Sequence, residues 1–126
     1  MSKDARPLSP HLQVYRPQLT SMLSILHRMT GFGLAVGAIA VTAWLMSAVM
    51  GEKAFNDFHA VAASLVGKLF LFGWVWAFVY HFLNGLRHLV WDTGRWLDLK
   101  SAYASGWIVF FSSFVLAAAV WFAAAG

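Results

Sequence analysis

Residues 69–86 read LFLFGWVWAFVYHFLNGL and contain no charged side chain. An α-helix rises about 1.5 Å per residue, so a run of this length crosses most of a hydrocarbon core of roughly 30 Å. Residues 29–51 and 101–126 also lack charge. Of the 126 residues in the chain, 60% are hydrophobic and only 11% are charged. A soluble domain of this size needs more charge to cover its surface, so the composition indicates a membrane protein.

The uncharged runs predict three transmembrane helices, at about residues 21–50, 62–91 and 102–124. We therefore expect an all-α fold in which residues 1–126 form a single membrane domain. Polar and charged residues fill the two connections. We interpret residues 51–60 as an outer loop and residues 92–100 as an inner loop, with Gly94 as the helix stop before the second loop.

Lysine and arginine are distributed unevenly between the two sides of this arrangement. One side carries Lys3, Arg6, Arg16, Arg28, Arg87, Arg95 and Lys100. The other side carries only Lys53 and Lys68. Because basic residues favour the cytoplasmic side of membrane proteins, we expect the N terminus in the cytoplasm and the C terminus outside.

Several classes of protein and of site are disfavoured by composition. The chain has no cysteine, which excludes disulfides, thiolate metal sites and thiol nucleophiles. The first 20 residues are polar and include three prolines, unlike a secretory signal or a mitochondrial transit peptide. We therefore expect a bacterial inner membrane rather than a mitochondrial one. The pI near 9.9 indicates contact with anionic lipid headgroups, not with nucleic acid.

Ionisable side chains inside a membrane span are costly and therefore mark candidate functional positions. Two sets of residues each share one face of a predicted helix: Ser24, His27, Arg28 and Gly31 on the first, and His81, Gly85 and His88 on the second. The third helix carries neither charge nor histidine after residue 101. We assign the third helix to packing and lipid contact.

The depth of these residues suggests a cofactor. Arg28 and Arg87 mark the inner ends of their helices, so His81 lies roughly 9 Å deeper in the bilayer. A neutral histidine below a group of cations suits haem, because iron takes an imidazole nitrogen while the propionates face the cations. Gly85, one turn from His81, leaves room for the macrocycle. However, a single histidine in a membrane helix is often a packing residue, and Arg28, Arg87 and His88 also fit the role of interfacial anchors.

Two parts of the chain carry long motifs. Residues 6–15 read RPLSPHLQVY and residues 24–31 read SILHRMTG. Residues 81–88 read HFLNGLRH and continue as LVWD to residue 92. In sequence, order and separation, these strings resemble the two signatures of the succinate dehydrogenase cytochrome b556 subunit, the haem b membrane anchor of complex II.

The resemblance implies a fold, a cofactor and roles for individual residues. The three helices form half of a heterodimeric haem-binding bundle, and a second membrane anchor subunit supplies the other half. His81 is one axial ligand of haem b, and the partner supplies the second. Ser24 and Arg28 belong to the ubiquinone pocket. The remaining implied roles are contacts with the haem propionates for His27, Arg28 and His88, and a supporting position beside the site for Asp92.

The implied function is electron transfer from an iron–sulfur subunit to ubiquinone. Ser24 donates a hydrogen bond to a quinone oxygen, and Arg28 supplies a positive charge that does not titrate. Succinate oxidation requires a flavoprotein subunit and iron–sulfur clusters, which this cysteine-free chain cannot hold. We therefore expect the chain to be part of an enzyme and inactive alone.

Three alternatives differ from this interpretation. The first is a haem-free tether for a soluble partner, which needs no deep histidine. The second is a small transporter or channel component, which should carry polar residues along the full depth of the membrane. The third is the anchor of a fumarate reductase, whose direction of turnover the sequence does not reveal.

Overall fold

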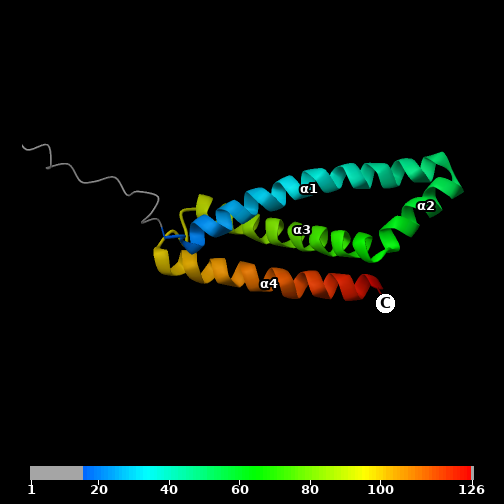
Figure 1. Cartoon of the computed structure of the whole chain (residues 1–126). Helices are drawn as coiled ribbons and strands as arrows, with labels where there is room; N and C mark the ends of the chain where they lie inside the picture. Colours follow the sequence, from blue (N-terminus) through cyan, green and yellow to red (C-terminus); the bar gives the residue numbers. More distant parts are fainter. Residues whose placement is uncertain (1–15, 126) are drawn as a thin grey trace, which may run out of the picture.

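The computed structural model describes residues 16–125, which form four helices and no strand in that range (Figure 1). The helices are α1 (Leu19–Met50), α2 (Glu52–Ala63), α3 (Leu65–Asp92) and α4 (Leu99–Ala125). Helices α1, α3 and α4 are long and apolar enough to cross a membrane. The expected all-α fold with three spans is confirmed.

The prediction of an outer loop at residues 51–60 is wrong, because most of this segment is helix α2. Gly51, with φ of 110°, reverses the chain after α1, and Ser64, in an extended conformation, separates α2 from α3. The Ser64 hydroxyl accepts a hydrogen bond from the Gly67 N–H at 3.1 Å and so caps α3. Charged residues favoured a loop in the sequence, but Lys53 and Asp57 pair across one helical turn at 2.6 Å instead.

The inner connection follows the prediction more closely. Helix α3 ends at Asp92, and Gly94 adopts a φ of 76° while its N–H donates to the Trp91 carbonyl at 2.8 Å. Gly94 is thus a helix stop, as expected. Helix α4 begins about one turn earlier than predicted because the Asp98 carboxylate accepts a hydrogen bond from the Ser101 N–H at 2.9 Å. The same hydrogen bond lowers the pKa of Asp98 below its ordinary value.

Helix α3 lies between α1 and α4 and packs against both (Figure 1). Small residues of α4, among them Ser113 and Ala117, are fully buried and allow α3 to approach closely. Tyr80 is also fully buried, and its hydroxyl donates to the Leu23 carbonyl of α1 at 2.8 Å. The Trp76 indole donates to the Ser113 hydroxyl at 3.1 Å. These contacts fix the rotation of α1 and α4 about α3.

Large apolar side chains cover most of the outer surface of the bundle. Phe32, Val49 and Phe70 are among the most exposed, with 74%, 81% and 77% of their surface accessible. Such a surface would be unstable in water, but it suits lipid tails or an apolar partner helix. The polar side chains that lie inside the bundle are therefore concentrated where the helices meet.

Candidate functional site

Three histidine rings stack where α1 meets α3. The ring centroids of His27 and His81 are 3.9 Å apart, with planes inclined by 7°. The ring of His88 lies on the other side of His27, at 5.0 Å and 29°. The structure therefore brings together the two helix faces that the sequence singled out. Within residues 16–125, however, no group of three histidine or acidic side chains is arranged to hold a metal ion by itself.

The position of His81 depends on a glycine of the opposite helix. A Cβ atom added at Gly31 would lie 2.9 Å from Cε1 of the His81 ring and 3.4 Å from its Nδ1. Any larger residue at position 31 would push the imidazole away from α1. The sequence places Gly31 on the same helix face as Ser24 and His27, and the structure gives it the role of admitting the ring.

The hydrogen bonds of His81 identify its tautomer. Its Nδ1 lies 3.0 Å from the His27 carbonyl oxygen, which can only accept a hydrogen bond. The Thr30 hydroxyl lies 3.3 Å from the same nitrogen and within 2.9 Å of the Leu26 and His27 carbonyls, to which it can donate its proton. We therefore assign the proton of the neutral ring to Nδ1. No described residue hydrogen-bonds Nε2, whose lone pair is then available to a ligand.

His88 shows the same preference through a local contact. Its Nδ1 lies 2.7 Å from the Asn84 carbonyl oxygen one turn earlier, so that Nδ1 is the donor and Nε2 is left for other partners. The ring also packs edge-on against Trp91, at 5.1 Å between centroids. Between His81 and His88, Gly85 faces open space, since no atom lies within 4 Å of a Cβ added there.

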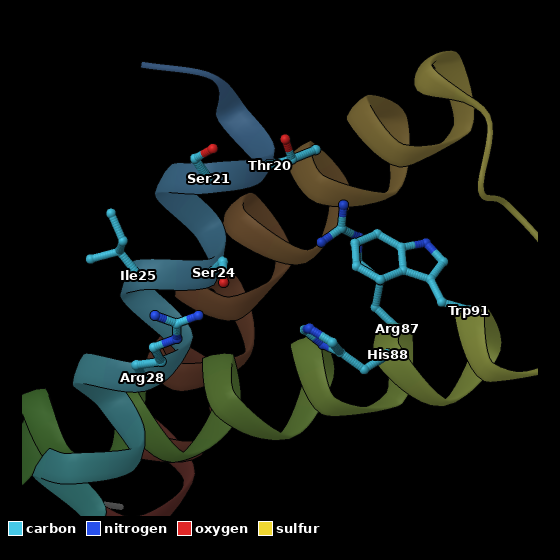
Figure 2. A pocket seen from close by; sticks show the side chains of 8 residues that line it. All are labelled: Thr20, Ser21, Ser24, Ile25, Arg28, Arg87, His88 and Trp91. Carbon is cyan, nitrogen blue, oxygen red and sulfur yellow. The ribbon is translucent and has the colours of Figure 1, made fainter. Parts of the chain in front are cut away.

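A pocket of about 390 Å³ opens between α1 and α3, next to the histidine stack (Figure 2). It is lined by Thr20, Ser21, Ser24, Ile25, Arg28, Arg87, His88 and Trp91. Figure 2 shows Ser24 and Arg28 on α1, across the pocket from His88 and Trp91 on α3. Three of the residues singled out in the sequence thus line one cavity, and they combine a hydroxyl, a guanidinium and an imidazole.

Arg87 is the residue of this pocket whose position the sequence did not reveal. The sequence indicates an interfacial anchor, but only 4% of the Arg87 surface is accessible. Its guanidinium donates to the Ser105 hydroxyl at 2.9 Å and to the Ala102 carbonyl at 2.7 Å, both on α4. It also donates to Asn84 at 3.3 Å and lies 4.1 Å from the centre of the Trp91 ring. Ser105, one of four serines on the mostly apolar α4, was the available signal.

Two predicted residues lie apart from the pocket lining. His27 is the middle ring of the stack, and its Nδ1 is buried without a hydrogen-bond partner among the described residues. Asp92, the last residue of α3, is exposed and forms neither an ion pair nor a side-chain hydrogen bond within residues 16–125. Its carboxylate therefore makes no polar contact with the site within that range.

Three apolar spans with a polar pocket between two of them define the class of protein. It is a multi-pass membrane protein with a polar pocket between two of its spanning helices. Residues 2–120 match the model of one family, described as the succinate dehydrogenase/fumarate reductase transmembrane subunit. The chain belongs to this family.

Individual relatives agree with the family match. The chain is 43% identical to the succinate dehydrogenase cytochrome b556 subunit of Paracoccus denitrificans, over 93% of this chain and 90% of the relative. The b556 subunit of Rickettsia prowazekii is 38% identical over 92% and 90%. The cytochrome b560 subunit of Marchantia polymorpha is 37% identical over 89% and 85%. These matches confirm the resemblance to cytochrome b subunits of succinate dehydrogenase.

Proposed function

We propose that this chain is the haem- and quinone-binding membrane anchor of a succinate:quinone oxidoreductase. In this function it binds haem b together with a second anchor subunit and forms part of the site where ubiquinone is reduced. The electrons come from the iron–sulfur subunit, which receives them from the flavoprotein subunit that oxidises succinate. The chain would lie in a bacterial inner membrane with its N terminus in the cytoplasm, and it would have no activity alone.

The tautomer of His81 is the observation that carries the haem proposal. Histidine ligands of metals usually donate their second ring N–H to a carbonyl or carboxylate, which fixes the ring and raises the basicity of the ligating nitrogen. The Nδ1–H of His81 has such a partner in the His27 carbonyl at 3.0 Å. Its Nε2 has no partner among the described residues. The ring is therefore prepared to bind iron through Nε2.

The surroundings of His81 also fit a haem. Gly31 admits the ring, and Gly85 leaves open space on the same face of α3, where a flat macrocycle needs room. The buried Nδ1 of His27 has no partner within the described range, and Arg28 and His88 line the adjacent pocket. These groups would bind the propionate carboxylates. Bound haem b supplies a centre that accepts and releases one electron.

A second subunit completes the site in this proposal. His81 would hold the haem through one nitrogen, and a haem held by two histidines would need a second one from elsewhere. Within residues 16–125, the only other histidine away from the stack is His59, which lies on α2 at the opposite end of α1. The exposed apolar surface of α1 and α3 is available to the helices of a partner. Half of a two-chain bundle is the arrangement that these observations support.

Ser24 and Arg28 would recognise the quinone. A quinone carbonyl accepts hydrogen bonds and gains negative charge when it is reduced. The Ser24 hydroxyl and the exposed Arg28 guanidinium line one wall of the pocket, where they can supply a donor and a permanent positive charge. Asp92, exposed at the end of α3, would act beside the site without touching the ligand. Protons would reach the quinone from water at the cytoplasmic side.

The dithionite-reduced minus air-oxidised spectrum of the purified complex tests this proposal. We expect a sharp b-type α band in the wild type, its loss in His81→Ala, and no change in the control His59→Ala, which alters an exposed histidine of α2. Flavin and iron–sulfur subunits should co-purify in all three cases. A complex with these subunits but without haem would favour the haem-free tether, and an unchanged spectrum in His81→Ala would exclude this residue as the ligand.

A further inference from the structure

Arg87 is a buried cation that has no acidic partner among residues 16–125. Only 4% of its surface is accessible. Within residues 16–125, the ion pair that forms is Lys53–Asp57 on α2, and no carboxylate reaches Arg87. Burying a guanidinium is costly unless an opposite charge compensates it, because burial removes the water that hydrates the charge. The charge of Arg87 is therefore uncompensated by any acidic side chain of the described range.

The contacts of Arg87 hold the group in place but do not neutralise it. Its hydrogen-bond acceptors are all neutral: the Ser105 hydroxyl, the Ala102 carbonyl and the Asn84 side-chain oxygen. A guanidinium has five N–H donors, and these contacts use three of them. Arg87 also lines the pocket between α1 and α3 (Figure 2). It thus keeps donors and an uncompensated charge for whatever occupies the pocket.

We propose that Arg87 binds a negatively charged oxygen of the ligand in this pocket, and that Ser105 of α4 positions Arg87 for this contact. The inference deepens the proposed function and rests on it. Two sources would provide such an oxygen: a haem propionate, or a quinone that has been reduced. A quinone that takes one electron from the iron–sulfur partner becomes a radical anion. A second electron and two protons from water then complete the quinol.

Arg87 differs from Arg28 in a way that makes this contact strong. Arg28 is exposed, so solvent and headgroups screen its charge. Arg87 is enclosed by α3 and α4 and stacked on Trp91 at 4.1 Å. An unscreened charge acts more strongly on a nearby anion than an exposed one. Arg28 would attract the ligand, and Arg87 would stabilise its negative charge.

Helix α4 thereby acquires a role in the site. The Ser105 hydroxyl accepts from Nε of Arg87 at 2.9 Å and itself lies 3.3 Å from the Ala102 carbonyl. Gly106 next to it is also required to be small, because a Cβ there would lie 2.6 Å from Leu23 and 3.4 Å from the guanidinium. Ser105 does not line the pocket between α1 and α3, so it acts through Arg87 and is a positioning residue.

The first experiment compares Arg87→Gln, Arg87→Lys and the control Arg95→Gln in the purified complex. Arg95 is a neighbouring exposed cation outside the pocket. Two quantities are measured: the stability of the quinone radical by EPR-monitored redox titration, and the midpoint potential of the haem. In Arg87→Gln we expect at least one of them to change by about tenfold, which is about 59 mV for a one-electron centre. The control should change neither, and Arg87→Lys should fall between.

The two readouts distinguish the sources of the anion. A weaker radical at constant haem potential assigns the oxygen to the quinone, and a lower haem potential at constant radical stability assigns it to a propionate. Unchanged values for both in Arg87→Gln would overturn the proposal. A wild-type complex without haem would refute the haem part of the proposed function, and the radical would still test Arg87.

A second pair of variants guards against a general loss of folding. Ser105→Ala removes the acceptor for Nε of Arg87, and Ser112→Ala is its matched control, since Ser112 makes the same local contact to a carbonyl three residues earlier at 3.3 Å. We expect Ser105→Ala to move the same quantity as Arg87→Gln, by a smaller factor, and Ser105→Thr to restore it. If Ser105→Ala and Ser112→Ala lower thermal stability equally and leave both readouts unchanged, Ser105 has only a packing role and the positioning claim fails.

Discussion

Two histidines of this chain make the same local hydrogen bond in very different surroundings. His88 on α3 approaches the carbonyl of Asn84 at 2.7 Å, and His59 on α2 approaches the carbonyl of Phe55 at 2.9 Å, in both cases one turn earlier. His88 lines the pocket, and its ring lies 5.0 Å from that of His27. His59 is exposed and lies at the opposite end of α1. The surroundings, not the residue type or the local contact, distinguish the proposed site histidine from the other one.

Two cations, Lys53 of α2 and Arg87 of α3, show the same contrast. Lys53 on α2 pairs with Asp57 at the surface, where solvent surrounds 90% of its side chain. Arg87 is enclosed and pairs with no acidic group in the described range. A surface pair satisfies itself and needs no ligand. A buried cation with only neutral partners can instead pair with a negatively charged group of a bound ligand.

The largest effect should come from closing the space for His81. Gly31→Val places methyl groups beyond a Cβ that already lies 2.9 Å from the ring, whereas Gly33→Val points into open space and is the control. Overpacking costs about 1–3 kcal/mol, occasionally more, and at the upper end haem occupancy should fall about a hundredfold. The pyridine haemochrome content of the purified complex measures this. Equal haem in both variants would contradict the assigned role of Gly31.

The next effect concerns the charge at the mouth of the pocket. Arg28→Leu removes a hydrogen bond from a charged group, worth about 1.5–3 kcal/mol, so succinate–quinone reductase activity should fall about tenfold or more. Reduction of a soluble dye by succinate should stay nearly constant, because it bypasses the quinone. Lys53→Leu is the control at the other end. Parallel loss of both activities in Arg28→Leu would indicate failed assembly rather than a quinone contact.

A smaller effect should follow from the hydrogen bond that joins α1 to α3 beside the site. Tyr80→Phe leaves the Leu23 carbonyl without its buried partner, which should cost about 1 kcal/mol of stability. Tyr103→Phe, for which no hydrogen bond is present within the described residues, is the control. Thermal unfolding of the purified complex measures the difference. The haem spectrum should be the same in both variants, and a lost α band in Tyr80→Phe would show that the bond also shapes the site.

The smallest effect should come from the exposed ion pair of α2. Asp57→Ala breaks the Lys53–Asp57 pair, but exposed pairs contribute at most about 1 kcal/mol. We expect no measurable change in haem content or quinone reduction, and a small loss of α2 helicity. A change in either functional readout would mean that α2 contributes to the site after all.

The spans could be predicted because a bilayer demands long uncharged helices, and three such runs are visible in the sequence. Helix α2 could not, since its alternation of charged residues with Phe55 and Phe58 fits both a loop and a short helix. Its formation depends on the turn at Gly51 and the break at Ser64. The local sequence around Gly51 and Ser64 does not indicate how the segment between them is oriented.

The candidate site shows the same division. Helical spacing placed Ser24, His27 and Arg28 on one face and His81 with His88 on another, and these faces meet. The burial of Arg87 was not predictable, because it depends on the rotation of α3 relative to α4. That rotation is fixed by contacts far apart in the sequence, such as Trp76 with Ser113. Helical periodicity indicates which residues share a face of one helix, but it does not indicate which faces of two helices pack together.

The partner that fixes the tautomer of His81 is a main-chain oxygen. Every amino acid at position 27 carries that carbonyl, so substitution there cannot remove the acceptor while α1 stays helical. Selection at position 27 would therefore act only on the ring that stacks between His81 and His88. The orientation of the proposed ligand is inherited from the packing of two helices, which makes it robust to mutational drift at the position that contacts it.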